Sequence, residues 1–257
     1  MSNQRISELL AKAAGADRVF PATDLYNEGW MLRLVLDWFS RNPDVDHDLR
    51  FCEGSRWSSE ALLPSAFLPR KRGDKLAESW THADGVIGHF SIGENGTGDL
   101  SLIENATQLV VTEAKMFSKL AAGVKNASYF DQAARNVACI AEVAKRAAIA
   151  PTSFINIAFF VIAPKARIEE GVFSEHMNLE SMQEVVRRRV AEYTEPEKDQ
   201  WLEEWFLPVS KAANIRCISW EEILTFISAQ NEADGQSLGE FYAKCLEFNQ
   251  FVARRYG

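Results

Sequence analysis

A strand, a helix and a second strand follow one another between residues 100 and 163, and this succession constrains the fold more than any other feature of the sequence. Residues 100–116 favour a strand, Ser128 is expected to cap a helix that ends near residue 148, and residues 154–163 form the nearly continuous apolar run typical of a buried strand. Neighbouring strands joined by a crossover helix are parallel, and the crossover is right-handed. The sequence therefore predicts a parallel strand pair.

An antiparallel pair is predicted just before this unit. Residues 82–92 also favour a strand, and the segment 93–98 that separates them from residues 100–116 reads Gly-Glu-Asn-Gly-Thr-Gly. Asn-Gly with neighbouring glycines is a strong hairpin signal, whereas a phosphate-binding loop would require a following Gly-Lys-Ser/Thr. A hairpin joined to a parallel unit gives a mixed central sheet, so the predicted fold class is α/β.

The other predicted elements surround this sheet in one domain of 257 residues, with a core at about 24–163 and a helical extension with one further strand at 164–257. Asp24 is expected to cap a helix that ends near residue 40. Further helices are expected at 6–14, 59–65, 175–193 and 197–213 and from Trp220 and Ser237, and further strands at 50–57 and 215–219.

Neither a membrane span nor a secretory signal is recognisable. The longest apolar stretches lie within residues 154–163, about half of the roughly 20 residues that a membrane helix needs. The N-terminal segment lacks a hydrophobic block followed by a small-residue cleavage site. We therefore expect a cytoplasmic protein that does not contact membranes.

Charge is distributed unevenly along the chain, whose net charge is −8. Residues 1–167 contain 19 basic and 19 acidic residues, whereas residues 168–257 contain 9 basic and 17 acidic residues. Between residues 110 and 150, six basic residues oppose three acidic ones, which gives a net charge of +3. The overall charge argues against a protein that coats nucleic acid, but the segment 110–150 could contact phosphates locally.

The triplet Glu113-Ala114-Lys115 ends the apolar strand 100–116. Alternate side chains of a strand point to the same face, so Glu113 and Lys115 are expected side by side. Asp84 begins the apolar part of the partner strand, in Ala83-Asp84-Gly85-Val86-Ile87, and it converges on Glu113 if the hairpin register is right. A surface Glu–Lys pair with an unrelated Asp is the alternative.

Such a group suits phosphodiester hydrolysis. Two close carboxylates repel each other unless a proton or a cation lies between them, and their hard oxygen atoms suit Mg²⁺ or Mn²⁺. A nearby lysine can position water and offset charge on a phosphate. Glu28 is a further candidate because it falls on the apolar stripe of the helix 24–40, where a carboxylate needs a partner or a cleft unless it simply reaches water.

The order of these residues resembles that of the PD-(D/E)XK nuclease superfamily, which has the restriction-endonuclease-like fold. The resemblance covers residues 24–163 and rests on Glu28, on Ala83-Asp84-Gly85-Val86-Ile87, on Glu113-Ala114-Lys115 and on Tyr129-Phe130-Asp131-Gln132. It implies a three-layer core with a mixed central sheet between helices. Ala83 stands where the family name has proline. The 29-residue step from Asp84 to Glu113 requires a long hairpin. If the chain folds otherwise, Asp99 or Glu104 is the first metal ligand in place of Asp84.

The resemblance also implies roles for individual residues. Asp84, Glu113 and the carbonyl group of Ala114 would hold Mg²⁺ or Mn²⁺. Lys115 would position the attacking water, and Glu28 would support the metal through water. Gln132 would orient Lys115 or contact the phosphate backbone, unless it simply faces solvent. Lys119, Lys125 and Arg135 of the basic segment are the expected nucleic-acid contacts.

The sequence therefore predicts a metal-dependent nuclease that acts on DNA more readily than on RNA and that could form a homodimer. A non-catalytic module of the same fold, which binds nucleic acid or presents its acidic C-terminal third to a protein partner, is the alternative. An unrelated α/β enzyme with Lys115 as an amine nucleophile is a third possibility. The sequence contains no Gly-x-Ser-x-Gly elbow, no paired-histidine helix motif and no dinucleotide-binding fingerprint.

Overall fold

The computed structural model describes residues 2–13, 15, 19–93 and 99–256. Five strands form its central sheet in the order β1-β2-β5-β6-β7, and two short strands form a second sheet. The strands are β1 (Arg56–Leu63), β2 (Thr81–Gly88), β3 (Phe90–Ile92), β4 (Leu100–Leu102), β5 (Gln108–Ala114), β6 (Asn156–Ala163) and β7 (Asn214–Ser219). The helices are α1 (Ser2–Ala11), η1 (Ala22–Asp24), α2 (Glu28–Arg41), α3 (Gln132–Arg146), η2 (Pro151–Ser153), α4 (Lys165–Glu169), α5 (Leu179–Ala191), α6 (Pro196–Trp201), η3 (Leu202–Phe206), α7 (Leu207–Ala212), α8 (Trp220–Gln230) and α9 (Glu232–Tyr256).

The mixed sheet is confirmed. β2 is antiparallel to β1 and β5, whereas β5, β6 and β7 are parallel. α3 connects β5 to β6, as the strand–helix–strand pattern predicts. β3 and β4 extend the long hairpin between β2 and β5 and pair in a sheet of their own. Of the predicted turn at 93–98, residues 94–98 lie outside the described residues.

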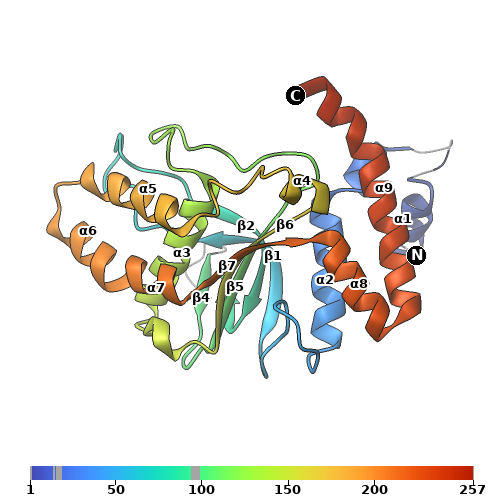
Figure 1. Cartoon of the computed structure of the whole chain (residues 1–257), viewed down its shortest axis with the longest axis horizontal. Helices are drawn as coiled ribbons and strands as arrows, with labels where there is room; N and C mark the ends of the chain where they lie inside the picture. Colours follow the sequence, from blue (N-terminus) through green and yellow to red (C-terminus); the bar gives the residue numbers. More distant parts are fainter. Residues whose placement is uncertain (1, 14, 16–18, 94–98, 257) are drawn as a thin grey trace.

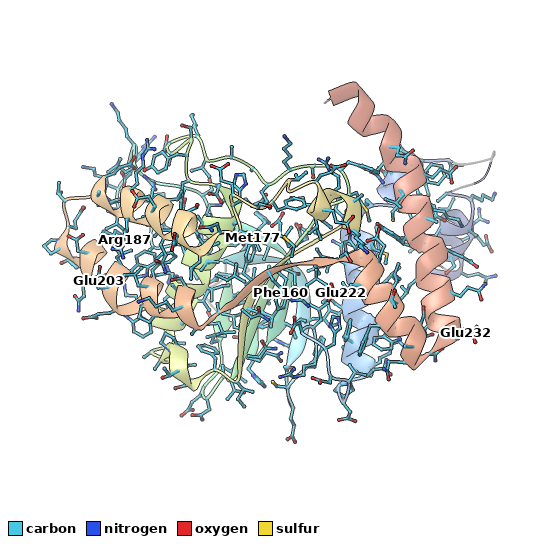
Figure 2. The ribbon with its side chains drawn as sticks, in the orientation of Figure 1. Phe160, Met177, Arg187, Glu203, Glu222 and Glu232 are labelled. Carbon is cyan, nitrogen blue, oxygen red and sulfur yellow. The ribbon has the colours of Figure 1, made fainter. Side chains whose placement is uncertain are left out.

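Helices cover both faces of the sheet and make three layers (Figure 1). α3, α5, α6 and α7 lie on one side, and α2, α8 and α9 lie on the other. Strand residues alternate between the two layers: Val111 and Phe159 pack with the α3 layer, and Val110 and Phe160 pack with the α2 layer. Phe160 lies at the centre of the molecule in Figure 2. This two-sided burial explains the nearly continuous apolar sequence of β6.

Several predicted boundaries were wrong because a different residue caps the helix. Asn27, rather than Asp24, caps α2 and accepts a hydrogen bond from Trp30 N at 2.9 Å. Asp131, rather than Ser128, caps α3, and its side chain accepts hydrogen bonds from the backbone amides of Ala133 and Ala134. All of these residue types are good caps, so composition alone could not choose between them.

The segment around β1 also differs from the prediction. A strand at 50–57 followed by a helix at 59–65 was expected, but β1 begins only at Arg56 and continues through most of the segment predicted as helix, as an edge strand paired with β2. Pairing with β2 overrides the ambiguous local sequence, and buried side chains alternate at Ala61 and Leu63. The predicted helix 197–213 is divided into α6, η3 and α7, and the last helix begins at Glu232 rather than Ser237.

Gly85 allows α2 to lie close to β2. A Cβ atom at this position would lie 2.6 Å from Thr112 Oγ1 and within 3.0 Å of Leu32 and Leu36 side chains. Because all three neighbours are buried, we expect Gly85→Ala to lower the free energy of unfolding by about 1–3 kcal/mol through overpacking. Urea unfolding followed by circular dichroism measures this change.

Gly239→Ala is the matched control. A Cβ atom at Gly239 in α9 meets no atom within 4 Å, and alanine favours helix. This variant should therefore be as stable as the wild type or slightly more stable. Equal stability of the Gly85 and Gly239 variants would contradict the close approach of α2 to β2.

Candidate functional site

Asp84 and Glu113 meet where the pairing of β2 and β5 ends. The last paired residues are Gly85 and Thr112, so one further step along the register brings Asp84 opposite Glu113. Ordinary pairing stops here because Asp84 Oδ2 accepts a hydrogen bond from the backbone amide of Ala114 at 2.8 Å. The side chain of Asp84 thus takes the place of a backbone acceptor at the end of β5.

Glu113 is 1% exposed and has an incomplete set of hydrogen bonds. Its Oε1 accepts hydrogen bonds from Lys115 Nζ at 2.6 Å and from Gln132 Nε2 at 2.5 Å. Its Oε2 is buried and has no hydrogen-bond partner among the described residues. An unpartnered buried carboxylate oxygen is costly, and a cation or a proton would satisfy it.

The pKa of Glu113 is raised to about 8. Burial is the main cause, and the nearby carboxylate of Asp84 adds to it. The ammonium group of Lys115 lowers this pKa but does not offset the two other effects. Glu113 therefore carries a proton at neutral pH when no cation is bound.

Gln132 is fixed by the loop that follows β5. As the first residue of α3, it donates a hydrogen bond from its backbone to Ala121 O at 2.9 Å, and its Oε1 accepts one from Ala121 N at 3.0 Å. Its side-chain nitrogen, Nε2, donates to Glu113 Oε1, so Gln132 contacts Glu113 rather than Lys115. Gln132 and Lys115 bind the same carboxylate oxygen and leave the other one available.

A cleft of about 550 Å³ opens beside these residues. Asp84, Ala114 and Lys115 line it together with Glu28, the first residue of α2, so the structure brings this predicted helix residue to the two strands. The full lining consists of Asp24, Asn27, Glu28, Gly29, Trp30, Arg33, Glu60, Asp84, Ala114, Lys115 and Asn249. The alternative first ligands lie elsewhere: Asp99 directly precedes β4, and Glu104 follows it in a turn.

The predicted nucleic-acid contacts divide into two kinds. Lys119 and Lys125 are exposed in the loop between β5 and α3. Arg135 is half-buried on α3. Burial raises the pKa of nearby Glu78, and the positive charge of Arg135 partly opposes this rise. Arg135 is therefore less accessible to a polyanion than the two lysines.

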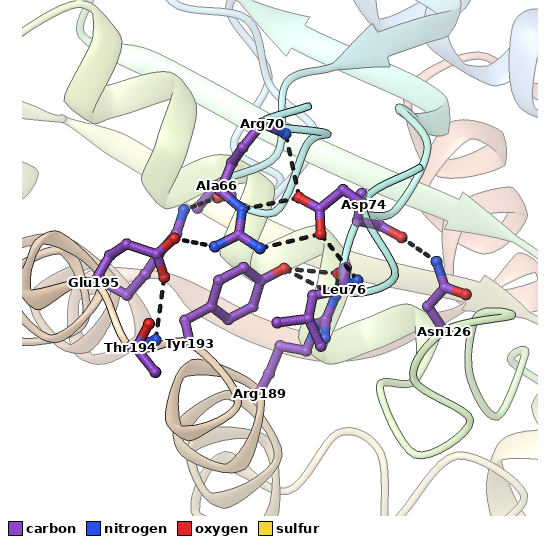
Figure 3. A network of polar contacts seen from close by, with 11 residues as sticks. Ala66, Arg70, Asp74, Leu76, Asn126, Arg189, Tyr193, Thr194 and Glu195 are labelled. Carbon is purple, nitrogen blue, oxygen red and sulfur yellow. Dashed lines mark hydrogen bonds and ion pairs between the residues drawn. The ribbon is translucent and has the colours of Figure 1, made fainter. Parts of the chain in front are cut away.

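A network of polar contacts fixes the loop between β1 and β2, which leads to Asp84 (Figure 3). Arg70 binds Asp74 at 2.8 Å within the loop and also pairs with Glu195 near α6. The hydroxyl group of Tyr193 donates to Leu76 O at 2.7 Å. Buried Arg189 of α5 donates to the same carbonyl, so the C-terminal helices brace this loop.

Sequence reasoning did not place most of the other cleft residues at the site, among them Trp30, Arg33 and Glu60. Trp30 and Arg33 are three positions apart on α2, so a helical wheel would have placed them side by side, but it turns Trp30 away from Glu28, two positions earlier. Glu60 could not have been found, because it reaches the cleft from an edge strand that was predicted as a helix. Its backbone is left-handed, with φ of 56°.

The donor set fits a hard divalent cation. It offers the carboxylates of Asp84 and Glu113 and the adjacent Ala114 carbonyl, and such oxygen donors with room for water suit Mg²⁺ or Mn²⁺. The described residues contain no cluster of three or more His, Cys, Asp or Glu side chains that could hold a metal. Any cation here would therefore depend on two carboxylates, a carbonyl oxygen and water or substrate.

Comparison of the chain with protein-family models, with curated proteins and with solved structures found no match. Within the described part of the chain, no helix is both long enough and apolar enough to cross a membrane.

Proposed function

We propose that this protein is a metal-dependent nuclease of the restriction-endonuclease-like fold, which hydrolyses phosphodiester bonds with DNA as the favoured substrate. One observation carries the proposal: Asp84, Glu113 and Lys115 meet at the end of β2 and β5, beside a polar cleft, with Glu113 Oε2 unpartnered. The three-layer arrangement around a mixed sheet is consistent with this fold. Cleavage of DNA and RNA in Mg²⁺ or Mn²⁺, compared with a Lys115 variant, tests the proposal.

The residues of the site would divide the work of hydrolysis. Asp84, Glu113 and the carbonyl group of Ala114 would hold Mg²⁺ or Mn²⁺, and Glu28 would contribute through water. The ion, when bound, supplies Lewis-acid stabilisation of negative charge on the phosphate. Lys115 is anchored on Glu113 at 2.6 Å, and an ammonium group has three N–H donors. Its other two donors can hold the attacking water and a phosphate oxygen.

Gln132 would keep this arrangement fixed. Its contact with Glu113 Oε1 and its two bonds to the Ala121 backbone leave the carboxylate little freedom to rotate. A fixed carboxylate also fixes Lys115 relative to the phosphate, and catalysis depends steeply on such positioning. Gln132 is therefore a positioning residue for both groups.

A non-catalytic module remains the second proposal, because the acidic C-terminal third could bind a basic protein partner. Glu203, Glu222 and Glu232 lie far apart over η3, α8 and α9 in Figure 2, so these three carboxylates do not form one patch. Lys115 as an amine nucleophile is less favoured, since its Nζ is engaged in a hydrogen bond to Glu113 Oε1 at 2.6 Å. Dimer formation by this chain also remains a proposal.

Lys119 and Lys125 are expected to contact phosphates from the loop after β5. Replacing either by Ala should weaken DNA binding modestly and reduce the slope of log K against log salt concentration by about 0.9 for duplex DNA or about 0.7 for a single strand. Arg135→Ala should leave the slope unchanged, because this side chain is half-buried near Glu78. Fluorescence anisotropy in Ca²⁺ at several salt concentrations measures these slopes. An unchanged slope in both lysine variants would contradict the assignment.

A further inference from the structure

Trp30 differs from the other tryptophans in its exposure. All seven tryptophans of the chain lie within the described residues, and Trp30 alone among them is exposed, at 39%. It lines the same cleft as Asp84, Ala114 and Lys115. Single exposed apolar residues are ordinary on a protein surface, but Trp30 stands in the lining of the cleft that holds Asp84 and Lys115, so a ligand of that cleft would meet a flat aromatic face.

The surroundings of Trp30 hold it in place. Its backbone amide donates to the capping side chain of Asn27 at 2.9 Å. The guanidinium group of Arg33 lies over its ring, 5.2 Å from the centroid. Arg33 is itself tied to β1, because its Nε donates to Ser59 Oγ at 3.0 Å. The indole therefore loses little conformational entropy when a ligand binds against it.

Two backbone features support this arrangement. A Cβ atom at Gly29 would lie 3.2 Å from Arg33 Nη1, so glycine leaves room for Arg33 to fold along the first turn of α2. Glu60 pairs with Arg33 at 3.4 Å and has a left-handed backbone. The pairing of β1 with β2 skips Glu60 but continues on both sides of it. A strained non-glycine residue kept in an otherwise regular strand is typical of functional sites.

We propose that Trp30, with Arg33 over one face of its ring, stacks its other face against an unpaired base of the nucleic acid whose phosphate binds, through a divalent cation, beside Asp84 and Lys115. The inference rests on the proposed nuclease function and specifies its substrate class. Within a duplex, neighbouring bases cover each other's faces, so an indole can reach a base face only where the strand is single, frayed or distorted. The substrate is therefore single-stranded or locally unpaired.

The charges of the cleft make this binding depend on a cation. Asp24, Glu28, Glu60 and Asp84 contribute four carboxylates to the lining, against the two cationic groups of Arg33 and Lys115. A polyanion that enters such a cleft is repelled until a divalent cation offsets the excess negative charge. Trp30 then contributes an attraction that does not depend on charge.

The test measures oligonucleotide affinity by fluorescence anisotropy in Ca²⁺, which replaces Mg²⁺ to slow cleavage. The probes are a labelled 20-nucleotide oligothymidylate and a blunt duplex of the same length. We expect Trp30→Ala to weaken binding of the single strand about tenfold or more and to change duplex binding less than twofold. Trp30→Phe should retain most of the affinity, since phenylalanine also stacks.

Trp205→Phe is the matched control, because this half-buried tryptophan lies on η3, in the other helical layer. Indole fluorescence provides a second readout: the single strand should quench the emission of the wild type and of Trp205→Phe, but quench Trp30→Phe much less. EDTA should abolish the quenching in all variants.

The outcomes separate this inference from the nuclease proposal. Equal single-strand affinity of the wild type and Trp30→Ala overturns the stacking role, whether or not the protein cleaves. Equal losses for single strand and duplex overturn the unpaired substrate. Trp30-dependent binding without cleavage of any DNA or RNA supports the stacking role and overturns the nuclease. Absence of binding to both probes overturns the inference.

Discussion

Lys115→Ala is expected to reduce metal-dependent cleavage by at least about 10²–10³-fold, the range seen when one charge-stabilising donor is removed from an active site. Lys115 is the only cation that the described residues place on Glu113, at 2.6 Å, so no neighbour could replace it. Single-turnover cleavage of single-stranded and duplex DNA in Mg²⁺ measures the loss.

The variant should remain folded, because Glu113 already carries a proton at neutral pH, so loss of its cationic partner leaves no unpaired buried charge. Circular dichroism and urea unfolding check this point. Lys211→Ala, which removes an exposed lysine on α7, is the control and should cleave like the wild type. Full activity of Lys115→Ala would overturn the nuclease assignment of this site, and Lys115→Arg tests whether the charge alone suffices.

Mn²⁺ affinity should rise about tenfold per pH unit from pH 6 to pH 8 and then level off. Below a pKa of about 8, Glu113 of the metal-free protein carries a proton, which a cation must displace before it can bind the carboxylate. At pH 7 each bound ion should therefore release about one proton. Calorimetric titration in two buffers of different ionisation enthalpy measures both the affinity and the proton release.

Glu113→Gln separates this explanation from a general effect of pH. The amide is similar in size but neither titrates nor binds a cation as a carboxylate does, so Mn²⁺ binding should be lost at every pH. Affinity that stays constant between pH 6 and pH 8, without proton release, would show that Glu113 holds no proton.

The raised pKa of Glu113 also makes the stability of the metal-free protein fall as the pH rises, whereas the affinity for Mn²⁺ increases. The folded metal-free protein binds this proton more tightly than the unfolded chain, whose Glu titrates near 4.5. The contribution of Glu113 to stability is therefore greatest below about pH 4.5 and is lost as the pH rises to about 8. Saturating Mn²⁺ should restore stability at pH 8, because the ion binds only the folded site.

The central sheet could be predicted because strong patterns specify it. β6 is apolar on both faces, α3 has helical periodicity, and the glycine-rich segment separates two strand patterns. β1 could not be predicted in the same way, because its sequence, RWSSEALL, lacks clear alternation and becomes a strand only by pairing with β2. The short helix expected there was wrong for this reason.

The meeting of Asp84 and Glu113 depended on a register that the sequence did not reveal. The two residues are separated by 29 positions, and a slip by one residue would have turned one of them to the other face of the sheet. Trp30 and Arg33 were not recognised for another reason. Helical spacing predicts that they are neighbours, but only the position of α2 beside β1 and β2 brings them to the cleft.

β7 has a consequence for the order in which the protein can fold during synthesis. β6 is buried along nearly its whole length, and one of its edges pairs only with β7, which lies about 50 residues later in the chain. While the ribosome has produced the chain only as far as α4, Asp84, Glu113 and Lys115 already exist, but β6 still presents an open apolar edge. The unpaired backbone groups of such an edge can pair with other chains, so nascent chains should depend on chaperones at this stage. The site would then become stable only when its last strand is made.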